Sequence, residues 1–224
     1  MNTSDARTVG IVGAGGMGTA ITKRLTHAGH SVLITDSKPE AAALAAKEGD
    51  GEPGRAQASS IEEVLAAEFV ILALWYPGTT EFAARHSEQL GGKIVVDIAN
   101  PLDSSFTGLT TDPSTSAAEE VAAALPDSAV VKAFNTVPAP TLLPGAVGGV
   151  ELDTFVAGDD QQAKDAVMGL LSGSGLRALD AGSLANSRLL ERLTAFGIEL
   201  GQRYGLGFGF GFKYLPFDEL ARLK

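Results

Sequence analysis

The amino-acid sequence predicts an α/β protein built on a doubly wound, mostly parallel β-sheet. Short apolar runs alternate with helical segments along almost the whole chain, and a glycine-rich turn joins the first apolar run to the first helix. The apolar runs are nearly continuous, which is typical of parallel strands covered by helices on both faces. The sequence therefore predicts a Rossmann-type sheet with a small C-terminal α/β extension.

The expected elements follow from this pattern in chain order. The runs interpreted as strands are Thr8–Val12, Ser31–Thr35, Phe69–Leu74, Lys93–Asp97, Val130–Ala133, Thr154–Ala157 and Arg177–Leu179. The segments interpreted as helices are Thr19–Ala28, Pro39–Lys47, Ile61–Ala66, Thr79–Leu90, Ala117–Leu125, Gln161–Leu171 and Leu184–Tyr204. The last helix is expected to turn Leu189, Leu193, Phe196 and Leu200 toward the core.

The composition changes near residues 138–140, which suggests a domain boundary there. We expect a dinucleotide-binding domain over residues 1–138. Residues 139–224 are expected to complete a pocket for a second cofactor or substrate and to form a dimer interface.

The glycine-rich turn has the spacing of a dinucleotide-binding loop. Gly13 permits a sharp turn after the strand, Gly15 lets the backbone approach a pyrophosphate, and Gly18 lets the helix pack on the strand. The N-terminus of the helix offers unpaired N–H groups to the anion. We therefore expect Gly13, Gly15, Gly16, Met17 and Gly18 to bind a dinucleotide.

Asp36 ends the second expected strand, where an acidic residue reads the ribose of NAD. A ribose phosphate, as in NADP, would be repelled by about 4 kcal/mol per charge at about 4 Å and an effective dielectric constant of about 20. Ser37 and Lys38 could offset this repulsion if Asp36 turned away. The motif alone favours NAD and leaves both cofactors open.

Other candidates follow strands at their carboxyl ends, where such sheets bind ligands. We interpret Leu74, Trp75 and Asn100 as walls of the cofactor pocket. The sequence has no obvious nucleophile–base pair and no metal-ligand spacing, which favours hydride transfer achieved by positioning. Lys132 is a weak candidate for an acid, because a strand-end lysine more often makes an ordinary ion pair.

The composition indicates which binding partners and which cellular compartment to expect. The formal net charge is −10, so nucleic acid and anionic membranes would be repelled. Cysteine is absent, which excludes disulfides and thiolate catalysis, and the first residues contain no signal-peptide segment. We expect a cytoplasmic protein whose partners are small-molecule cofactors.

Three further segments bear on the second ligand and on assembly. Residues 205–212 alternate glycine with leucine or phenylalanine, which indicates packing or a homodimer interface, or alternatively the wall of a flat-ring pocket. Residues 104–116 are rich in Ser, Thr, Gly and Pro and are expected to form a mobile loop near the ligand. Arg188 begins the last helix, where a cation opposes the helix dipole, so an anionic or carbonyl-bearing ligand is expected beside it.

Two motifs carry a resemblance to a known family. Val131-Lys132-Ala133-Phe134-Asn135-Thr136-Val137-Pro138-Ala139 and Leu179-Asp180-Ala181-Gly182-Ser183-Leu184-Ala185-Asn186-Ser187-Arg188-Leu189 resemble segments of the NADPH:coenzyme F420 oxidoreductases and of the cytosolic domain of STEAP metalloreductases. The glycine-rich turn and residues 211–215 fit the same family. The resemblance implies that a nicotinamide and a deazaflavin lie face to face and exchange a hydride. It also implies ring-stacking and second-cofactor roles for Asn135, Thr136, Val137, Ala139, Arg188 and Thr194.

The chain departs from the family pattern at three places. Asn135 stands where archaeal members have histidine, Arg192 stands where they have serine, and residues 36–38 replace an NADP-binding Ser-Arg-Arg. The first hypothesis is hydride transfer between NADP, or NAD, and coenzyme F420. The alternatives are an NAD(P)-dependent reductase of a small carbonyl or imine substrate and a non-catalytic dinucleotide-binding sensor.

Overall fold

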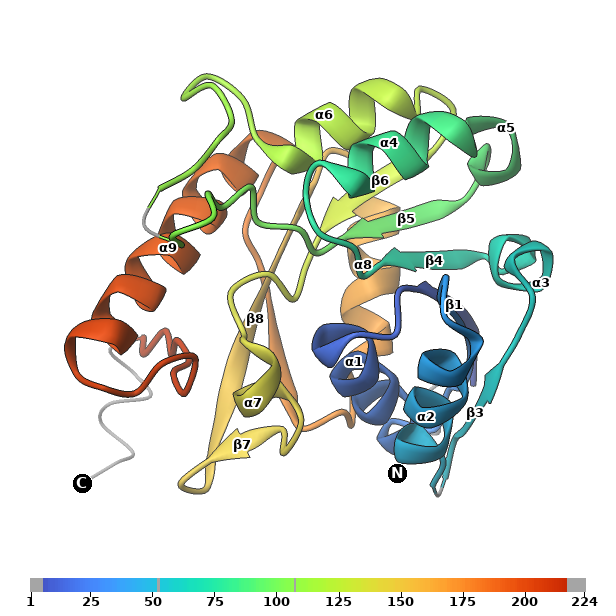
Figure 1. The fold of residues 1–224 in the computed structure, drawn as a ribbon, viewed down its shortest axis with the longest axis horizontal. Helices are drawn as coiled ribbons and strands as arrows, with labels where there is room; N and C mark the ends of the chain where they lie inside the picture. The colour runs from blue at the N-terminus through green and yellow to red at the C-terminus, as the bar shows by residue number, and fades with distance from the viewer. Residues whose placement is uncertain (1–5, 52, 107, 217–224) are drawn as a thin grey trace.

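One nine-stranded sheet organises the described part of the chain, residues 6–51, 53–106 and 108–216 of the computed structural model (Figure 1). The strands are β1 (Thr8–Val12), β2 (Ser31–Thr35), β3 (Arg55–Ala58), β4 (Phe69–Leu72), β5 (Ile94–Asp97), β6 (Ala129–Lys132), β7 (Ala146–Val147), β8 (Val150–Gly158) and β9 (Leu176–Asp180). Their order is β3-β2-β1-β4-β5-β6-β8-β7, with β9 paired to β8. Strands β1 to β6 are parallel and β8 runs antiparallel to β6. The predicted doubly wound fold is confirmed.

Helices cover both faces of this sheet. They are α1 (Gly16–His27), α2 (Pro39–Gly49), α3 (Ile61–Ala66), α4 (Gly78–Arg85), α5 (Ser87–Leu90), α6 (Ala117–Ala124), α7 (Ala139–Leu142), α8 (Gln161–Leu170) and α9 (Ser187–Arg203), with a short 3₁₀ helix at Leu184–Asn186. Figure 1 shows α4 beside α6 and places α9 at the outer edge of the molecule. No helix in the described ranges is both long and apolar enough to cross a bilayer.

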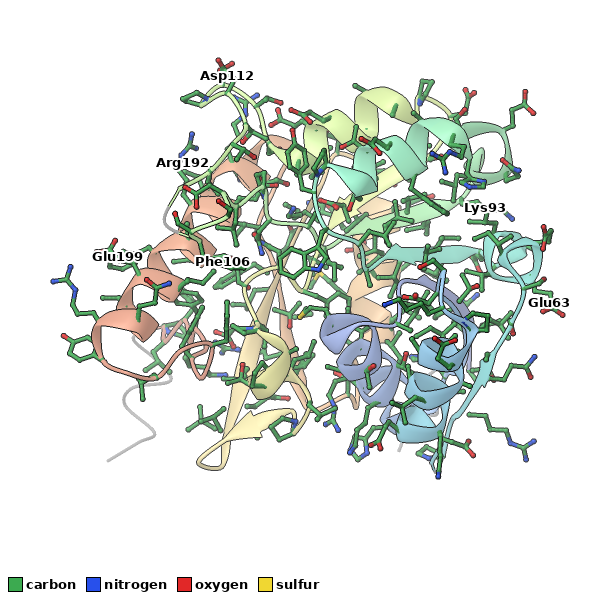
Figure 2. The ribbon with its side chains drawn as sticks, viewed as in Figure 1. Glu63, Lys93, Phe106, Asp112, Arg192 and Glu199 are labelled. Carbon is green, nitrogen blue, oxygen red and sulfur yellow. The ribbon has the colours of Figure 1, made fainter. Side chains whose placement is uncertain are left out.

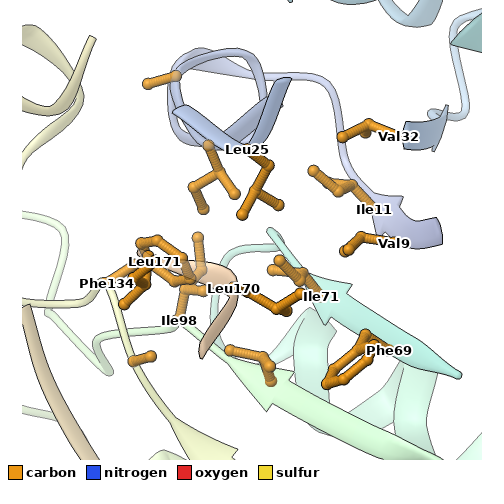
Figure 3. Close-up of a cluster of buried hydrophobic side chains, with 14 of the residues drawn as sticks. Val9, Ile11, Leu25, Val32, Phe69, Ile71, Ile98, Phe134, Leu170 and Leu171 are labelled. Carbon is orange, nitrogen blue, oxygen red and sulfur yellow. The ribbon is translucent and has the colours of Figure 1, made fainter. Parts of the chain in front are cut away.

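Two buried apolar clusters hold these layers together. On one face, Leu25 of α1 and Leu170 and Leu171 at the end of α8 pack with Ile11 of β1 and Ile71 of β4 (Figure 3). The other cluster joins α3, α4 and α6 to the opposite face. Burying one such side chain stabilises the folded state by about 1.5–3 kcal/mol relative to leaving it exposed to water. The strands are apolar on both faces because helices cover both of them.

The structure adds elements that the sequence pattern did not predict. Strand β3 was missed because Arg55 and Gln57 point to solvent and no apolar run marks this edge strand. The expected helix over residues 79–90 breaks at His86 into α4 and α5. The division at residue 138 stays a prediction, although the sheet itself continues across it through the pairing of β6 with β8.

The expected orientation of α9 was wrong. Leu189 is 63% exposed and Phe196 is 52% exposed. The buried face instead carries Leu190, Glu191, Thr194, Gly197, Ile198 and Gly201. Two physical causes decide this: Glu191 pairs with a buried lysine, and the glycines leave room for the tail, since a Cβ on Gly197 would collide with the ring of Phe210.

The glycine–aromatic tail folds back on its own chain. Buried Asp153 of β8 binds Arg177 Nε at 2.8 Å and Lys213 Nζ at 2.9 Å, and it also accepts from the backbone N–H of Tyr214. The backbone N–H of Asp153 donates to the Phe212 carbonyl. This tether fixes the tail against β8 and β9.

We predict that Asp153→Asn lowers the free energy of unfolding by about 3 kcal/mol at pH 7, because two cations lose a buried anionic partner. Burial raises the pKa of Asp153, but hydrogen bonds from Arg177, Tyr214 and Lys213 outweigh it and hold the pKa below its usual range. The stabilisation is therefore present above the unfolded pKa of about 4 and is lost as pH falls through the lower folded value. Urea titrations at pH 7 and pH 3 should show the difference between wild type and variant shrinking at the lower pH. A difference independent of pH would contradict the electrostatic explanation.

Candidate active site

An apolar cavity of about 290 Å³ opens where β1, β4, β5 and β6 end at their carboxyl termini. It gathers many of the predicted site residues: Gly15, Gly16, Met17, Leu74, Trp75, Asn100, Asn135, Val137, Ala139 and Thr194. The predicted residues outside its lining are Gly13, Gly18, Asp36, Ser37, Lys38, Lys132, Thr136 and Arg188. A larger and more open groove lies at the opposite end of the sheet, lined in part by Asp127, Asp159 and Asp160. The cavity, and not the groove, adjoins the glycine-rich turn.

The three glycines of the fingerprint have different physical roles. Gly13 has a positive φ of 103°, and a Cβ there would collide with the Ala73 carbonyl. A Cβ on Gly18 would collide with the Gly13 carbonyl. Gly15 differs, because no atom lies within 4 Å of the position that its Cβ would take. Gly13 and Gly18 are required by the fold, whereas Gly15 leaves open space beside the start of α1, as a pyrophosphate site requires.

The carboxylate of Asp36 is engaged with the backbone. Its Oδ2 accepts from Ala14 N at 2.8 Å and its Oδ1 accepts from Lys38 N at 2.9 Å. Burial raises the pKa of Asp36, but these bonds and one from Ser37 outweigh it and hold the pKa below its usual range. Asp36 thus ties the end of β2 to the glycine-rich turn, while Ser37 and Lys38 remain exposed.

Asn100, Asn135 and Thr194 form the polar wall of the cavity. Asn100 Nδ2 donates to the Asn135 carbonyl and Asn135 Nδ2 donates to Asn100 Oδ1, each at 3.0 Å. Thr194 Oγ1 also donates to the Asn135 carbonyl at 3.0 Å. Asn135 Oδ1 is buried and has no hydrogen-bond partner within the described ranges. A buried acceptor without a donor fits a ligand N–H, such as the carboxamide of a nicotinamide or the imide of a deazaflavin.

Phe134 turns the chain so that Asn135 reaches this wall. It has a φ of 62° and is only 1% exposed. A left-handed conformation costs a non-glycine residue about 1–2 kcal/mol. Burial of the ring in the core offsets this cost at the end of β6.

Lys132 lies behind the cavity in a buried ion cluster. Its Nζ lies 2.7 Å from Asp97 Oδ2 and 2.8 Å from Glu191 Oε1, and it also donates to the Ala99 carbonyl. Burial lowers the pKa of Lys132, but the charges of Asp97 and Glu191 outweigh it and hold the pKa above its usual range. Lys132 is fully buried and does not line the cavity, so its contacts are those of an ion pair and not of an acid facing a ligand.

Arg188 has an internal partner. Its Nε lies 2.8 Å from Glu119 Oε2, and this ion pair accounts for a cation at the start of α9 without an external anion. A ligand-binding role for Arg188 stays a prediction, and so does one for Thr136, whose side chain is buried outside the lining.

Three aromatic side chains from separate segments form the rim of the cavity. The ring centroids of Trp75 and Phe106 lie 6.1 Å apart, and those of Phe106 and Phe208 lie 5.8 Å apart, both edge to face. Phe106 comes from the 104–116 loop (labelled in Figure 2) and Phe208 from the tail. Sequence reasoning missed Phe106, which belongs to no periodic pattern, and it anticipated Phe208 only through the flat-ring alternative for the tail.

Comparisons with known proteins identify the relatives of this chain. Residues 8–101 match the family described as "NADP oxidoreductase coenzyme F420-dependent". The F420-dependent NADP reductase of Methanothermobacter marburgensis is 32% identical in an alignment 203 residues long, which covers 84% of this chain and 89% of that protein. Metalloreductase STEAP3 of Rattus norvegicus is 31% identical over 189 residues, so 84% of this chain matches 36% of that longer protein. A crystal structure of a candidate F420-dependent NADP reductase from Arthrobacter sp. FB24 has a TM-score of 0.77 at 30% identity, covering 94% of this chain and all of that one.

We predict that Lys132→Met lowers the free energy of unfolding by at least about 3 kcal/mol, because it leaves two buried carboxylates without their cation. Urea denaturation followed by circular dichroism measures this loss. Arg7→Met is the control, since it removes an exposed 3.5 Å pair with Glu68 and should cost less than about 1 kcal/mol. Similar losses in the two variants would show that the buried cluster stabilises the fold no more than an exposed ion pair does.

Proposed function

We propose that the chain transfers a hydride between NADP and coenzyme F420. It belongs to the F420-dependent NADP reductase family and is therefore an NADP-linked oxidoreductase. The cavity at the carboxyl ends of the strands is the proposed site of transfer.

One observation carries the choice of acceptor. None of the described residues that line the cavity has a titratable side chain, and its polar side chains are those of Asn100, Asn135, Thr194 and Trp75. Reduction of a ketone or imine leaves charge localised on one atom, and this usually requires a positioned proton donor. A deazaflavin spreads the added charge over a conjugated ring system. An apolar cavity that positions two rings and excludes water suits the second reaction.

The chain's own groups have distinct tasks in this proposal. The N–H groups at the start of α1 and the open space at Gly15 would hold the pyrophosphate. Exposed Ser37 and Lys38 would hold the ribose phosphate of NADP, since the carboxylate of Asp36 is already bonded to backbone N–H groups. Asn135 Oδ1 would accept a ring-borne N–H. When bound, the nicotinamide supplies or accepts the hydride.

The aromatic rim and the apolar wall complete the arrangement. Val137 and Ala139 would flank the stacked rings from the segment after β6, and Thr194 would fix Asn135 from α9. Trp75, Phe106 and Phe208 would shield the rings from water. Arg188 and Thr136 would support this segment from outside the lining.

We predict that purified protein reduces coenzyme F420 with NADPH and does so more slowly with NADH, as measured by the loss of deazaflavin absorbance. Gly15→Ala should raise the Kd for NADPH at least about tenfold, because the added methyl group occupies the space needed by the pyrophosphate. Failure of F420 reduction with either nucleotide, while NADPH still binds, would refute the proposed acceptor.

Gly169→Ala is the matched control for this experiment. Its added Cβ also meets nothing within 4 Å, but Gly169 lies on the exposed side of α8, away from the cavity. It should leave the Kd for NADPH unchanged. An equal loss of binding in both variants would remove Gly15 from the proposed site.

We predict that Lys38→Ala lowers kcat/KM for NADPH about tenfold and leaves kcat/KM for NADH unchanged, because one charge-assisted contact to the ribose phosphate is lost. Initial rates with the two nucleotides measure this. Lys47→Ala, an exposed lysine in the last turn of α2, should change neither value. A parallel loss with both nucleotides would place Lys38 away from the phosphate.

A further inference from the structure

The tail brings one aromatic side chain to the rim of the cavity. Phe208 lines the cavity, is 42% exposed, and meets the ring of Phe106 edge to face. Phe210 and Phe212 pack instead over Gly197 of α9, where a Cβ would collide with both rings. Phe208 therefore belongs to the cavity, whereas its two aromatic neighbours hold the tail on the helix.

Hydrogen bonds hold the tail on both sides of Phe208. Before it, the backbone N–H groups of residues 206–207 donate to the carbonyl of Gly201, near the end of α9, at 2.7 and 3.1 Å. After it, the Phe210 carbonyl accepts from Thr141 Oγ1 at 2.8 Å. The first anchor is local in sequence, but Thr141 lies on α7, 69 positions before Phe210.

Thr141 joins the tail to the wall of the cavity. Its side chain is buried, and its hydroxyl oxygen also lies 2.9 Å from the Pro138 carbonyl. Pro138 and Ala139, which come shortly before it, line the cavity, whereas Thr141 itself does not. A hydroxyl has a single hydrogen, so this group is shared between one carbonyl of the wall and one carbonyl of the tail. Thr141 thus sets where the tail lies relative to the wall.

We propose that Thr141 is a positioning residue for the second ring, because it holds the tail so that Phe208 closes the cavity over that ring. The inference rests on the proposed function, in which the second ring is the deazaflavin. The edge of a phenyl ring attracts the face of a flat conjugated ring, and a ring at the rim keeps water out.

The tail is expected to act on the second ring more than on the dinucleotide. In the proposed function the dinucleotide is also held outside the cavity, at the start of α1 and at residues 37–38. The deazaflavin ring depends on the cavity and its rim. A displacement of Phe208 should therefore weaken binding of coenzyme F420 and leave binding of NADPH nearly unchanged.

The substitution Thr141→Val tests the proposal, because it replaces the hydroxyl with a methyl group of similar size. It should raise the KM for coenzyme F420 about fivefold, as expected for one lost hydrogen bond, and leave the KM for NADPH within about twofold of wild type. Thr141→Ser keeps the hydroxyl and should retain both wild-type values. Initial rates measure the two constants, and circular dichroism checks that each variant is folded.

Thr26→Val is the matched control. Thr26 is also buried, and its hydroxyl donates to the Gly49 carbonyl at the end of α1 that is remote from the cavity. This variant loses a similar hydrogen bond and should change neither KM. An equal rise in the KM for coenzyme F420 in Thr26→Val and Thr141→Val would mean a general loss of stability and would overturn the proposal.

A double variant tests whether Thr141 acts through Phe208. Phe208→Ala alone should raise the KM for coenzyme F420 about tenfold, because the ring that covers the deazaflavin is lost. Adding Thr141→Val to Phe208→Ala should cause no further rise, since the threonine then has no ring to position. A double variant in which the two single effects multiply would overturn the proposal.

Failure of the inference and failure of the proposed function give different results. A wild-type chain that does not reduce coenzyme F420 with NADPH would exclude both. Turnover by the wild-type chain, together with an unchanged KM for coenzyme F420 in Thr141→Val, would overturn the role of Thr141 and leave the proposed function standing.

Discussion

The rest of the structure depends on the buried cation of Lys132. It lies between carboxylates from β5 and α9, so one side chain joins two strands and the C-terminal helix directly behind the cavity. Removing two carboxylates from water is costly unless a cation neutralises them, and this cluster supplies the cation at hydrogen-bonding distance. Because Glu191 must reach Lys132, α9 turns its polar and small residues inward. The apolar stripe on its outer side is therefore a consequence of where the charge lies.

The cavity in front of this cluster contrasts with it. Behind the wall are full charges, whereas the lining offers only amide, hydroxyl and indole groups. Lys132 donates to the Ala99 carbonyl, and Asn100, the residue after Ala99, donates to the Asn135 carbonyl. The buried ion cluster therefore also holds the polar wall of the cavity in place. A wall without titratable side chains suits a reaction whose main requirement is the relative placement of two rings.

Local sequence rules predicted the parallel sheet, the glycine-rich turn and most of the cavity lining. Gly13, Gly15 and Gly18 could be interpreted from the sequence because their roles depend on the immediate chain geometry. The orientation of α9 could not, because hydrophobic periodicity finds an apolar stripe but does not say whether the core or a second surface covers it. The ion pair of Arg188 with Glu119 could not be predicted from local sequence patterns either, since the two residues lie 69 positions apart.

The rim of the cavity has an optical consequence. The chain contains one tryptophan, and that residue is Trp75, which is 73% exposed beside Phe106. The emission of an indole changes with the polarity of its surroundings and with nearby groups that quench it. Trp75 is therefore a natural fluorescent label at the entrance of the cavity. A change in the surroundings of Trp75 at the entrance of the cavity can therefore be followed by emission without adding a dye or changing a residue.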